Sequence, residues 1–331
     1  MTSQKTRVLR WAGLVLALAA FVVYRIEDPG AAKPPPAPKP PTEQQRGATR
    51  LAVLADGGAD VAVQRAELRQ YLEDSGISGE SIDTVFRHTR DGIALRPGHD
   101  GARTRLGGPA LLPAGEKWPT AANGDKLSFI AALDFAELPR TKELPEDGLL
   151  ALYWDRDWRK RKGKRDFVAA TRTFFIAPGE PSREPRAPKS TLPIGYKPLR
   201  GAAMPIAGDP KLLAGELRGR ADAAQVRNAL GELELQGVYP HHVLGSPIEN
   251  HGAVLQGMSG YFNPTLGYLT EASRERFTPA ERTGGKWTLL AQFEEQEGFD
   301  LARGSKLYFV ILERDLELGR FDRVIGIEDS D

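Results

Sequence analysis

The sequence predicts an α+β domain built mainly on antiparallel sheets, with helices at its N-terminal end. Three observations predict this class: amphipathic helical segments come first, short apolar runs between glycine- and proline-rich turns follow, and one strand–loop–strand unit recurs. The 331 residues are 40% hydrophobic and 27% charged, which is ordinary globular composition. A chain of this length can bury a sufficient core without disulfides or metals.

Two helices are predicted ahead of the strands. Residues 59–74 carry apolar side chains at helical spacing and end before Gly76. A second helix starts at Ser78 or Ser81 and ends at Gly92, where an extended region begins. Serine is a preferred first cap and glycine a frequent terminator.

Strands are predicted wherever short apolar runs lie between turn residues. The runs are 127–134, 149–154, 167–176, 287–293 and 307–312. Residues 178–210 hold eight prolines and are predicted to be a long surface connection. A further helix is predicted over 221–235.

An internal duplication is suggested by two of these strand pairs. Residues 127–154 and 287–312 both read as an apolar strand, an acidic loop and an apolar strand with a central aromatic. Repetition of this kind indicates duplicated units. Two unrelated strand pairs of an α+β sheet would look similar, so both interpretations stay open.

The N-terminal segment predicts a single membrane anchor. Residues 1–10 form a basic stub, and residues 11–26 are predicted to be an uncleaved transmembrane helix, because 11–24 carry no charge. The alternatives are a cleaved signal peptide, with Ala17-Leu18-Ala19 as its small-residue triplet, and a soluble helix. Basic residues precede the segment, which favours a cytoplasmic N-terminus. The composition is typical of a bacterial protein, so we expect an inner-membrane protein with a periplasmic C-terminal domain.

A linker is predicted between the anchor and the domain. Residues 27–48 include the stretch PGAAKPPPAPKPP, which holds seven prolines. Such a stretch favours extended polyproline II and acts as a semi-rigid spacer. The globular domain is then predicted over residues 49–331.

Composition excludes several classes of function. The chain has no cysteine, which excludes thiol nucleophiles, disulfides and cysteine-bound metals. Lysine and arginine total 45 against 44 acidic residues, so net charge gives no attraction to nucleic acid. No phosphate-binding loop, dinucleotide fingerprint or nucleophile elbow is present. We expect no cofactor, no resident metal and no nucleic-acid partner.

His241 is the candidate functional histidine. It lies in a cluster with His242 and His251, near Glu249. Adjacent strand residues point to opposite faces, so His241 and His242 would not share a metal ion. We expect a buried His241 to hydrogen-bond the turn at Gly245-Ser246-Pro247. The alternative is acid–base catalysis by His241 with a carboxylate at a strand end, chosen from Asp134, Glu294, Glu295 and Glu297.

A strongly basic segment, residues 156–165, is called here the basic tip. It has the sequence RDWRKRKGKR and lies between two predicted strands, so it is expected at a hairpin tip. Seven cations there predict contact with an anionic membrane surface or an acidic protein, and Trp158 would add an apolar contact. A solvated tip is the alternative. The candidate binding residues are Arg156, Trp158, Arg159, Lys160, Arg161, Lys162, Lys164 and Arg165.

A set of motif residues is spread along the domain in the order Gly107, Gly108, Pro109, Trp118, His241, Gly245 and Gln292. In these residues and their order the sequence resembles the YwqG-like family, whose biochemical function is unknown. The similarity spans about residues 60–325. Ala132 stands where the family has glutamine, and the family's tryptophan–glycine–aspartate is replaced near Leu301-Ala302-Arg303. The resemblance implies an α+β fold and, from roles proposed for relatives, immunity to secreted toxins.

These observations together predict a membrane-tethered, non-catalytic binding or interaction domain. Its partners would be the lipid bilayer, through residues 11–26, and an anionic surface. Two alternatives stay open. One is a hydrolase that uses His241 with a strand-end carboxylate, and the other is an immunity-like protein directed against a secreted toxin.

Overall fold

The computed structural model describes most of the chain from Thr42 onward. The described residues are 42–158, 166–191, 193–208, 210–238, 241–248, 254–255, 257–263, 269–295, 299, 301 and 304–329. The predicted anchor and the proline-rich stretch up to residue 41 lie outside them. None of the helices within these ranges has the length and apolar character that a membrane crossing requires.

Three helices open the described chain: α2 (Glu43–Asp56), α3 (Val61–Asp74) and α4 (Gly79–Arg87). Thr42 and Gln45 form a capping box, in which each side chain accepts a hydrogen bond from the other's backbone N–H. The prediction that 43–48 belong to the linker is therefore wrong, because this cap starts a helix there. Helix α4 also ends before Gly92, which lies in the first strand.

A ten-stranded antiparallel sheet forms the body of the domain, in the order β12-β11-β10-β9-β1-β8-β2-β4-β5-β6. β3 (Leu112–Pro113) and β7 (Ser182–Arg183) pair separately. The ten strands are β1 (Arg90–Pro97), β2 (Arg105–Leu106), β4 (Ser128–Asp134), β5 (Leu149–Trp154), β6 (Thr171–Ile176), β8 (Lys197–Ile206), β9 (His241–Leu244), β10 (Trp287–Glu294), β11 (Lys306–Leu312) and β12 (Ile325–Asp329).

Two strand predictions need correction. The proline-rich region 178–210 contains β8, a ten-residue strand, rather than a connection throughout. β8 pairs with β2 only at Lys197 and Pro198, so most of its length has β1 as its one neighbouring strand. Proline lacks a backbone N–H, and a strand that is unpaired on one side tolerates it. The strand predicted over 167–176 begins only at Thr171, because residues 167–170 form a turn.

The two edges of the sheet approach each other, so that it nearly closes into a barrel. The backbone N–H of Gly326 in β12 donates to the Thr171 hydroxyl in β6, at 2.7 Å. The Thr173 hydroxyl donates to the Phe321 carbonyl, in the 3-10 turn before β12. The largest apolar cluster contains residues of β1, β5, β9, β10 and β11, and it fills the space that the sheet encloses.

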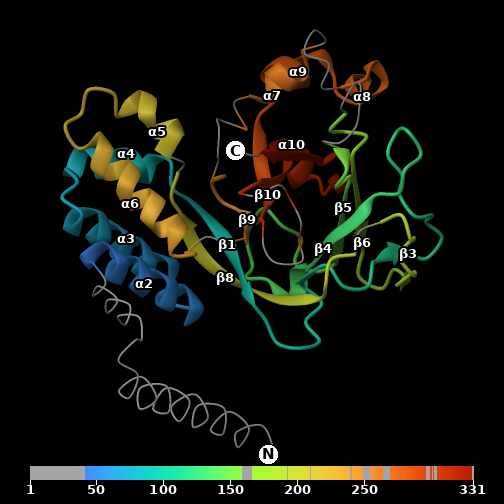
Figure 1. Ribbon diagram of the computed structural model, residues 1–331, viewed down its shortest axis with the longest axis horizontal. Helices are drawn as coiled ribbons and strands as arrows, with labels where there is room; N and C mark the ends of the chain where they lie inside the picture. Colours follow the sequence, from blue (N-terminus) through green and yellow to red (C-terminus); the bar gives the residue numbers. More distant parts are fainter. Residues whose placement is uncertain are drawn as a thin grey trace, which may run out of the picture. The chain divides into compact units, whose positions relative to one another are not determined.

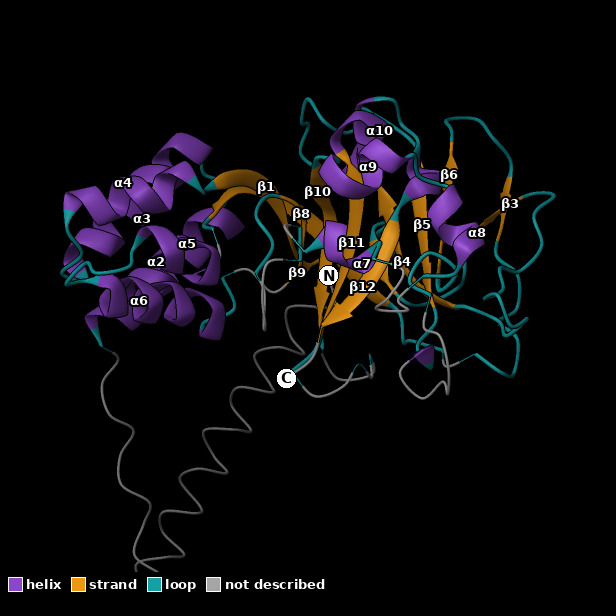
Figure 2. Ribbon diagram, turned by 90° about the horizontal axis from the view of Figure 1, so that it is seen from above, coloured by secondary structure: helices purple, strands orange, loops and turns teal. Residues whose placement is uncertain are grey.

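Helices cover the outer face of the central strands. α2, α3 and α4, with α5 (Pro210–Glu216) and α6 (Ala223–Leu235), gather beside one part of β1 and β8 (Figures 1 and 2). A second apolar cluster joins these helices to Ala94, Met204 and Ile206 of the two strands. The smaller helices α7 (Met258–Tyr261), α8 (Glu271–Glu275), α9 (Pro279–Gly284) and α10 (Glu313–Glu317) lie at the opposite side of the domain (Figure 2).

The two strand pairs in which the sequence suggests a duplication, β4–β5 and β10–β11, share the same backbone irregularities. The β4–β5 register shifts between Phe129 and Ala131, and the β10–β11 register shifts between Leu289 and Ala291. The strand beside each pair, β2 or β9, ends in two residues with positive φ. These are Gly107 (61°) and Gly108 (77°) in one half, and Leu244 (58°) and Gly245 (79°) in the other. An internal duplication predicts such a correspondence.

Candidate functional site

His242, and not His241, holds the turn after β9. His242 Nε2 donates to the Ser246 carbonyl at 3.1 Å, and its complete burial lowers the pKa of His242 to about 3. His241 Nδ1 instead accepts from the backbone N–H of Glu294, at 3.1 Å. The prediction that His241 hydrogen-bonds this turn is therefore wrong, because the neighbouring His242 does so. The expectation of opposite faces agrees with these different partners.

The strand-end carboxylates do not meet the His241 ring among the described residues. Burial raises the pKa of Asp134, whose Oδ2 lies 3.0 Å from Arg103 Nη1. Burial also raises the pKa of Glu294 to about 7, with its Oε1 3.9 Å from Lys306 Nζ. Because β10 side chains alternate, the Glu294 carboxylate lies on the face opposite Phe293, the ring next to His241.

The remaining acid and histidine candidates add no metal site in the described structure. Glu295 Oε2 accepts from the backbone N–H of Gly304, at 2.6 Å. His251, Glu249 and Glu297 lie outside the described residues. Within the described ranges, no group of three or more metal-ligating side chains could hold an ion.

The basic tip is only partly within the described structure. Arg156 is half-buried, while Arg159, Lys160, Arg161, Lys162, Lys164 and Arg165 lie outside the described residues. The prediction that Trp158 is a surface contact is wrong, because its side chain is 5% exposed. Its indole packs against Trp154 and Phe167 and donates to Glu328 Oε2 at 2.6 Å.

The motif residues of the resemblance build turns and strand contacts. Gln292 Oε1 accepts from the Ile248 backbone N–H at 2.9 Å, in the loop that follows Gly245. Trp118 Nε1 donates to the Leu127 carbonyl at 2.8 Å. Gly107 and Gly108 take left-handed conformations, and the carbonyl of Pro109 accepts from Arg105. Ala132 cannot make the bond that Gln292 makes.

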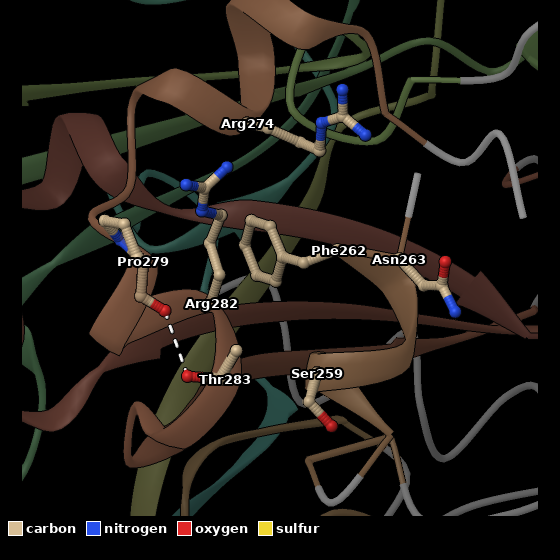
Figure 3. Close-up of a pocket in the computed structure, with 7 residues that line it drawn as sticks. All are labelled: Ser259, Phe262, Asn263, Arg274, Pro279, Arg282 and Thr283. Atoms are coloured by element: carbon tan, nitrogen blue, oxygen red, sulfur yellow. Dashed lines mark hydrogen bonds between the residues drawn. The ribbon is translucent and has the colours of Figure 1, made fainter. Parts of the chain in front are cut away.

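A pocket that the sequence analysis missed lies between α7, α8 and α9. Its volume is about 520 Å³. Figure 3 shows the Arg282 side chain extending beside the Phe262 ring toward α8, from which Arg274 projects. The lining residues are Ser259, Phe262, Asn263, Arg274, Pro279, Arg282 and Thr283. We call this cavity the arginine pocket.

Rigid neighbours position the walls of the arginine pocket. The Phe262 ring packs against Phe277 and Trp287, with ring centres 5.2 and 5.8 Å away. Thr270 caps the start of helix α8, and its hydroxyl donates to Asp166 Oδ2 at 2.6 Å. Helix α9 begins with a capping box between Thr278 and Glu281. The two helices that carry the arginines are thus fixed at their starts.

The side chains of the two arginines differ from those of their neighbours in having no polar partner among the described residues. Arg314 and Arg323 both bind Glu281, and Arg276 donates to the Asp322 carbonyl. Arg274 and Arg282 are half-buried, yet neither makes an ion pair or side-chain hydrogen bond with any described residue. Charged residues on short helices normally indicate a solvated surface, so no sequence signal would have identified this pair.

Comparison with known protein families gives one match. A model of the family described as "Domain of unknown function (DUF1963)" matches residues 104–329. This range begins just before β2 and reaches the end of β12, so it covers both strand units and the arginine pocket. No curated protein matches the sequence.

Proposed function

The chain belongs to the family described as a domain of unknown function (DUF1963), and from this premise we propose that it is a binding domain for a small anionic ligand. The arginine pocket is the proposed site. In this proposal, residues 11–26 tether the domain to a membrane, and the cations of the basic tip lie near anionic headgroups.

The observation that carries the proposal is the pair of half-buried arginines, Arg274 and Arg282, which make no ion pair with any described residue. A partly desolvated cation without a partner is unfavourable, and an anion that binds between two of them relieves that cost. The planar guanidinium donates two parallel hydrogen bonds to a phosphate or carboxylate. Two such groups match the charge of a dianionic phosphate monoester.

The other walls of the pocket indicate what accompanies the anionic group. Phe262 and Pro279 provide apolar surface, which favours a ligand with an apolar or aromatic body next to its charge. Ser259 adds a hydroxyl at the rim. Pockets that combine an apolar wall with a few convergent polar groups are typical of small-molecule sites. Phenyl phosphate has both features and is a suitable probe.

The test is calorimetric titration of the full chain with phenyl phosphate. We expect saturable binding, weakened at least tenfold by Arg274→Gln or Arg282→Gln, because each change removes one charge-assisted contact. The control Arg218→Gln removes an exposed guanidinium outside the pocket and should leave the affinity unchanged. Equal weakening by all three variants would show nonspecific charge attraction, and no binding by the wild type would also refute the proposal.

A further inference from the structure

A strand-wide gap opens in the sheet where β9 ends. β9 pairs with β1 from Leu95↔His241 to Gly92↔Leu244, whereas β1 continues to Arg90 along β8. On its other side β9 pairs with β10 only at His242 and Val243, whereas β10 extends back to Trp287. Residues 90–91 and 287–290 therefore have no β9 residue between them. We call this place the β9 gap.

The turn that ends β9 is fixed by three side chains. Leu244 and Gly245 take left-handed conformations, which lead the chain out of the sheet. His242 and Gln292 then hold Ser246 and Ile248, as described above, and the Tyr308 hydroxyl donates to the Ile248 carbonyl at 2.8 Å. All three anchoring side chains are buried. The gap is consequently a built feature of the fold.

A groove of about 800 Å³ occupies the same place. Its walls come from the start of β1 (Arg90, Asp91 and Gly92), the end of β9 (Leu244 and Gly245), Thr288 of β10, the start of α3, the loop 140–143 and helix α10. The agreement between the groove and the missing strand pairs shows that the gap is open to a ligand. Strand edges without partners are sites where another chain adds.

The corresponding place in the other half of the domain is filled by the chain itself. After β2, the Gly107 N–H donates to the Ile130 carbonyl at 2.7 Å, and the Gly108 N–H donates to the Ile194 carbonyl at 2.9 Å. The Leu127 N–H, just before β4, donates to the Pro119 carbonyl at 3.0 Å. The chain at Gly107 and Pro119 thus contacts the β4 edge at Ile130 and Leu127. No described residue does the same for β10.

Charged residues without an ion pair to any described residue are of opposite sign at the two rims of the groove. Arg90 on the β1 side is exposed and makes no ion pair with any described residue. Glu313 and Glu317 on the α10 side likewise have no ion pair in the described structure. Arg65, also in the wall, is held by Asp91 at 2.7 Å. A segment with an acidic side chain toward β1 and a basic one toward α10 would complement these rims.

We propose that an extended segment of a partner protein adds as a strand in the β9 gap, antiparallel to both β1 and β10. Its backbone would pair with residues 90–91 and with Thr288, the β10 residue that lines the groove, and alternate side chains would face the charged rims. This inference does not depend on the anion-binding proposal, because it uses a different set of residues.

Selection from a library of nine-residue peptides tests the proposal. The full chain should enrich peptides that carry one acidic and one basic residue, and Arg90→Glu with Glu317→Lys should weaken the best peptide at least tenfold. N-methylation of alternate peptide residues should weaken it similarly, because strand addition requires backbone N–H donors. The matched control Arg274→Gln should retain full peptide affinity and lose only phenyl phosphate binding.

Three outcomes would overturn the proposal. They are failure to enrich any peptide, binding that survives the double charge reversal, and binding that survives N-methylation in both alternate registers. Self-association of the chain that the double reversal abolishes would identify a second copy, rather than a partner protein, as the occupant. Urea unfolding of each variant establishes that it is folded before its affinity is compared.

Discussion

At the residue scale, the buried His242 ring makes the stability of the domain depend on pH. Burial lowers its pKa from 6.5 to about 3, so the unfolded chain takes up a proton at a pH where the folded chain does not. Stability from this residue is therefore complete above pH 6.5 and is lost as pH falls from 6.5 toward 3. The expected slope is about 1.4 kcal/mol per pH unit.

Urea unfolding between pH 5.5 and 4.5 measures this contribution, because the histidine of the unfolded chain is then almost fully protonated. His242→Gln should remove about 1.4 kcal/mol per pH unit from the slope, whereas His99→Gln, at an exposed position, should keep the wild-type slope. If both variants show the wild-type slope, the protonation of His242 is not coupled to folding.

The same residue shows what sequence can and cannot predict about a site. The pattern correctly indicates that a histidine holds the Gly245-Ser246-Pro247 turn and that His241 and His242 face opposite ways. It cannot decide which one faces the turn, because a shift of one residue in register exchanges the two faces of a strand. The pairing of His242 with Ala94 and Gln292 fixes that register, and both partners are distant in sequence.

At the scale of elements, the turn between β9 and its following loop depends on Gly245. Its φ is 79°, and a Cβ atom there would lie 2.6 Å from Ile206 Cδ1. We expect Gly245→Ala to lower the free energy of unfolding by about 2–3 kcal/mol, because the residue is strained and Ile206 must also move.

Gly219→Ala is the matched control for this prediction. Gly219 has a similar φ of 82°, but no atom lies within 4 Å of its added Cβ. We expect it to lose only the conformational part, about 1 kcal/mol. Equal losses in urea unfolding would show that contact with Ile206 contributes nothing.

Sequence patterns predicted the apolar strands and the helices α3, α4 and α6, and the two longest elements that they missed, α2 and β8, were missed for identifiable reasons. Helix α2 was missed because Thr42 and Gln45 follow a proline-rich stretch, and only their reciprocal bonds reveal the cap. β8 was missed because prolines usually exclude strands, and its free side becomes visible only from the sheet order. The apolar strands β4, β5, β10 and β11 were predictable because their burial is nearly continuous.

At the scale of the whole molecule, the Thr171 hydroxyl makes one of the two side-chain bonds described between the edges of the sheet. Thr171 accepts the Gly326 N–H and donates to the Phe167 carbonyl, both at 2.7 Å. Thr171→Val keeps the shape of the side chain but removes both bonds, so we expect a loss of about 2–4 kcal/mol in the free energy of unfolding. Faster hydrogen exchange at Gly326 would locate the effect at β12.

The comparison variant is Thr49→Val, which removes an exposed hydroxyl that bonds within helix α2. It should change stability by less than about 0.5 kcal/mol. Slow exchange at Gly326 in Thr171→Val would mean that other contacts hold the two edges together.

Sequence could not predict the closure of the sheet, the arginine pocket or the β9 gap. The closure and the β9 gap depend on segments far apart in the chain, such as Thr171 with Gly326 and Arg90 with Thr288. The arginine pocket is local in sequence, but it depends on which charges Arg274 and Arg282 meet. Local periodicity identifies a strand but does not identify its neighbours, and the absence of a charge partner can be recognised only when all neighbours are placed. The resemblance supplied motif positions, which proved to be turns and strand contacts.

The central position of β1 determines when the domain can form during synthesis. β1 ends at Pro97, yet its two neighbours begin at Lys197 and His241. The strands β2, β4, β5 and β6 can pair as soon as they emerge from the ribosome. β1 can pair only after more than a hundred further residues have been synthesised. Such non-local pairing slows folding and leaves strand edges exposed to aggregation in the meantime. The nascent chain therefore exposes β1 without a pairing strand for a long interval, during which a chaperone can bind it.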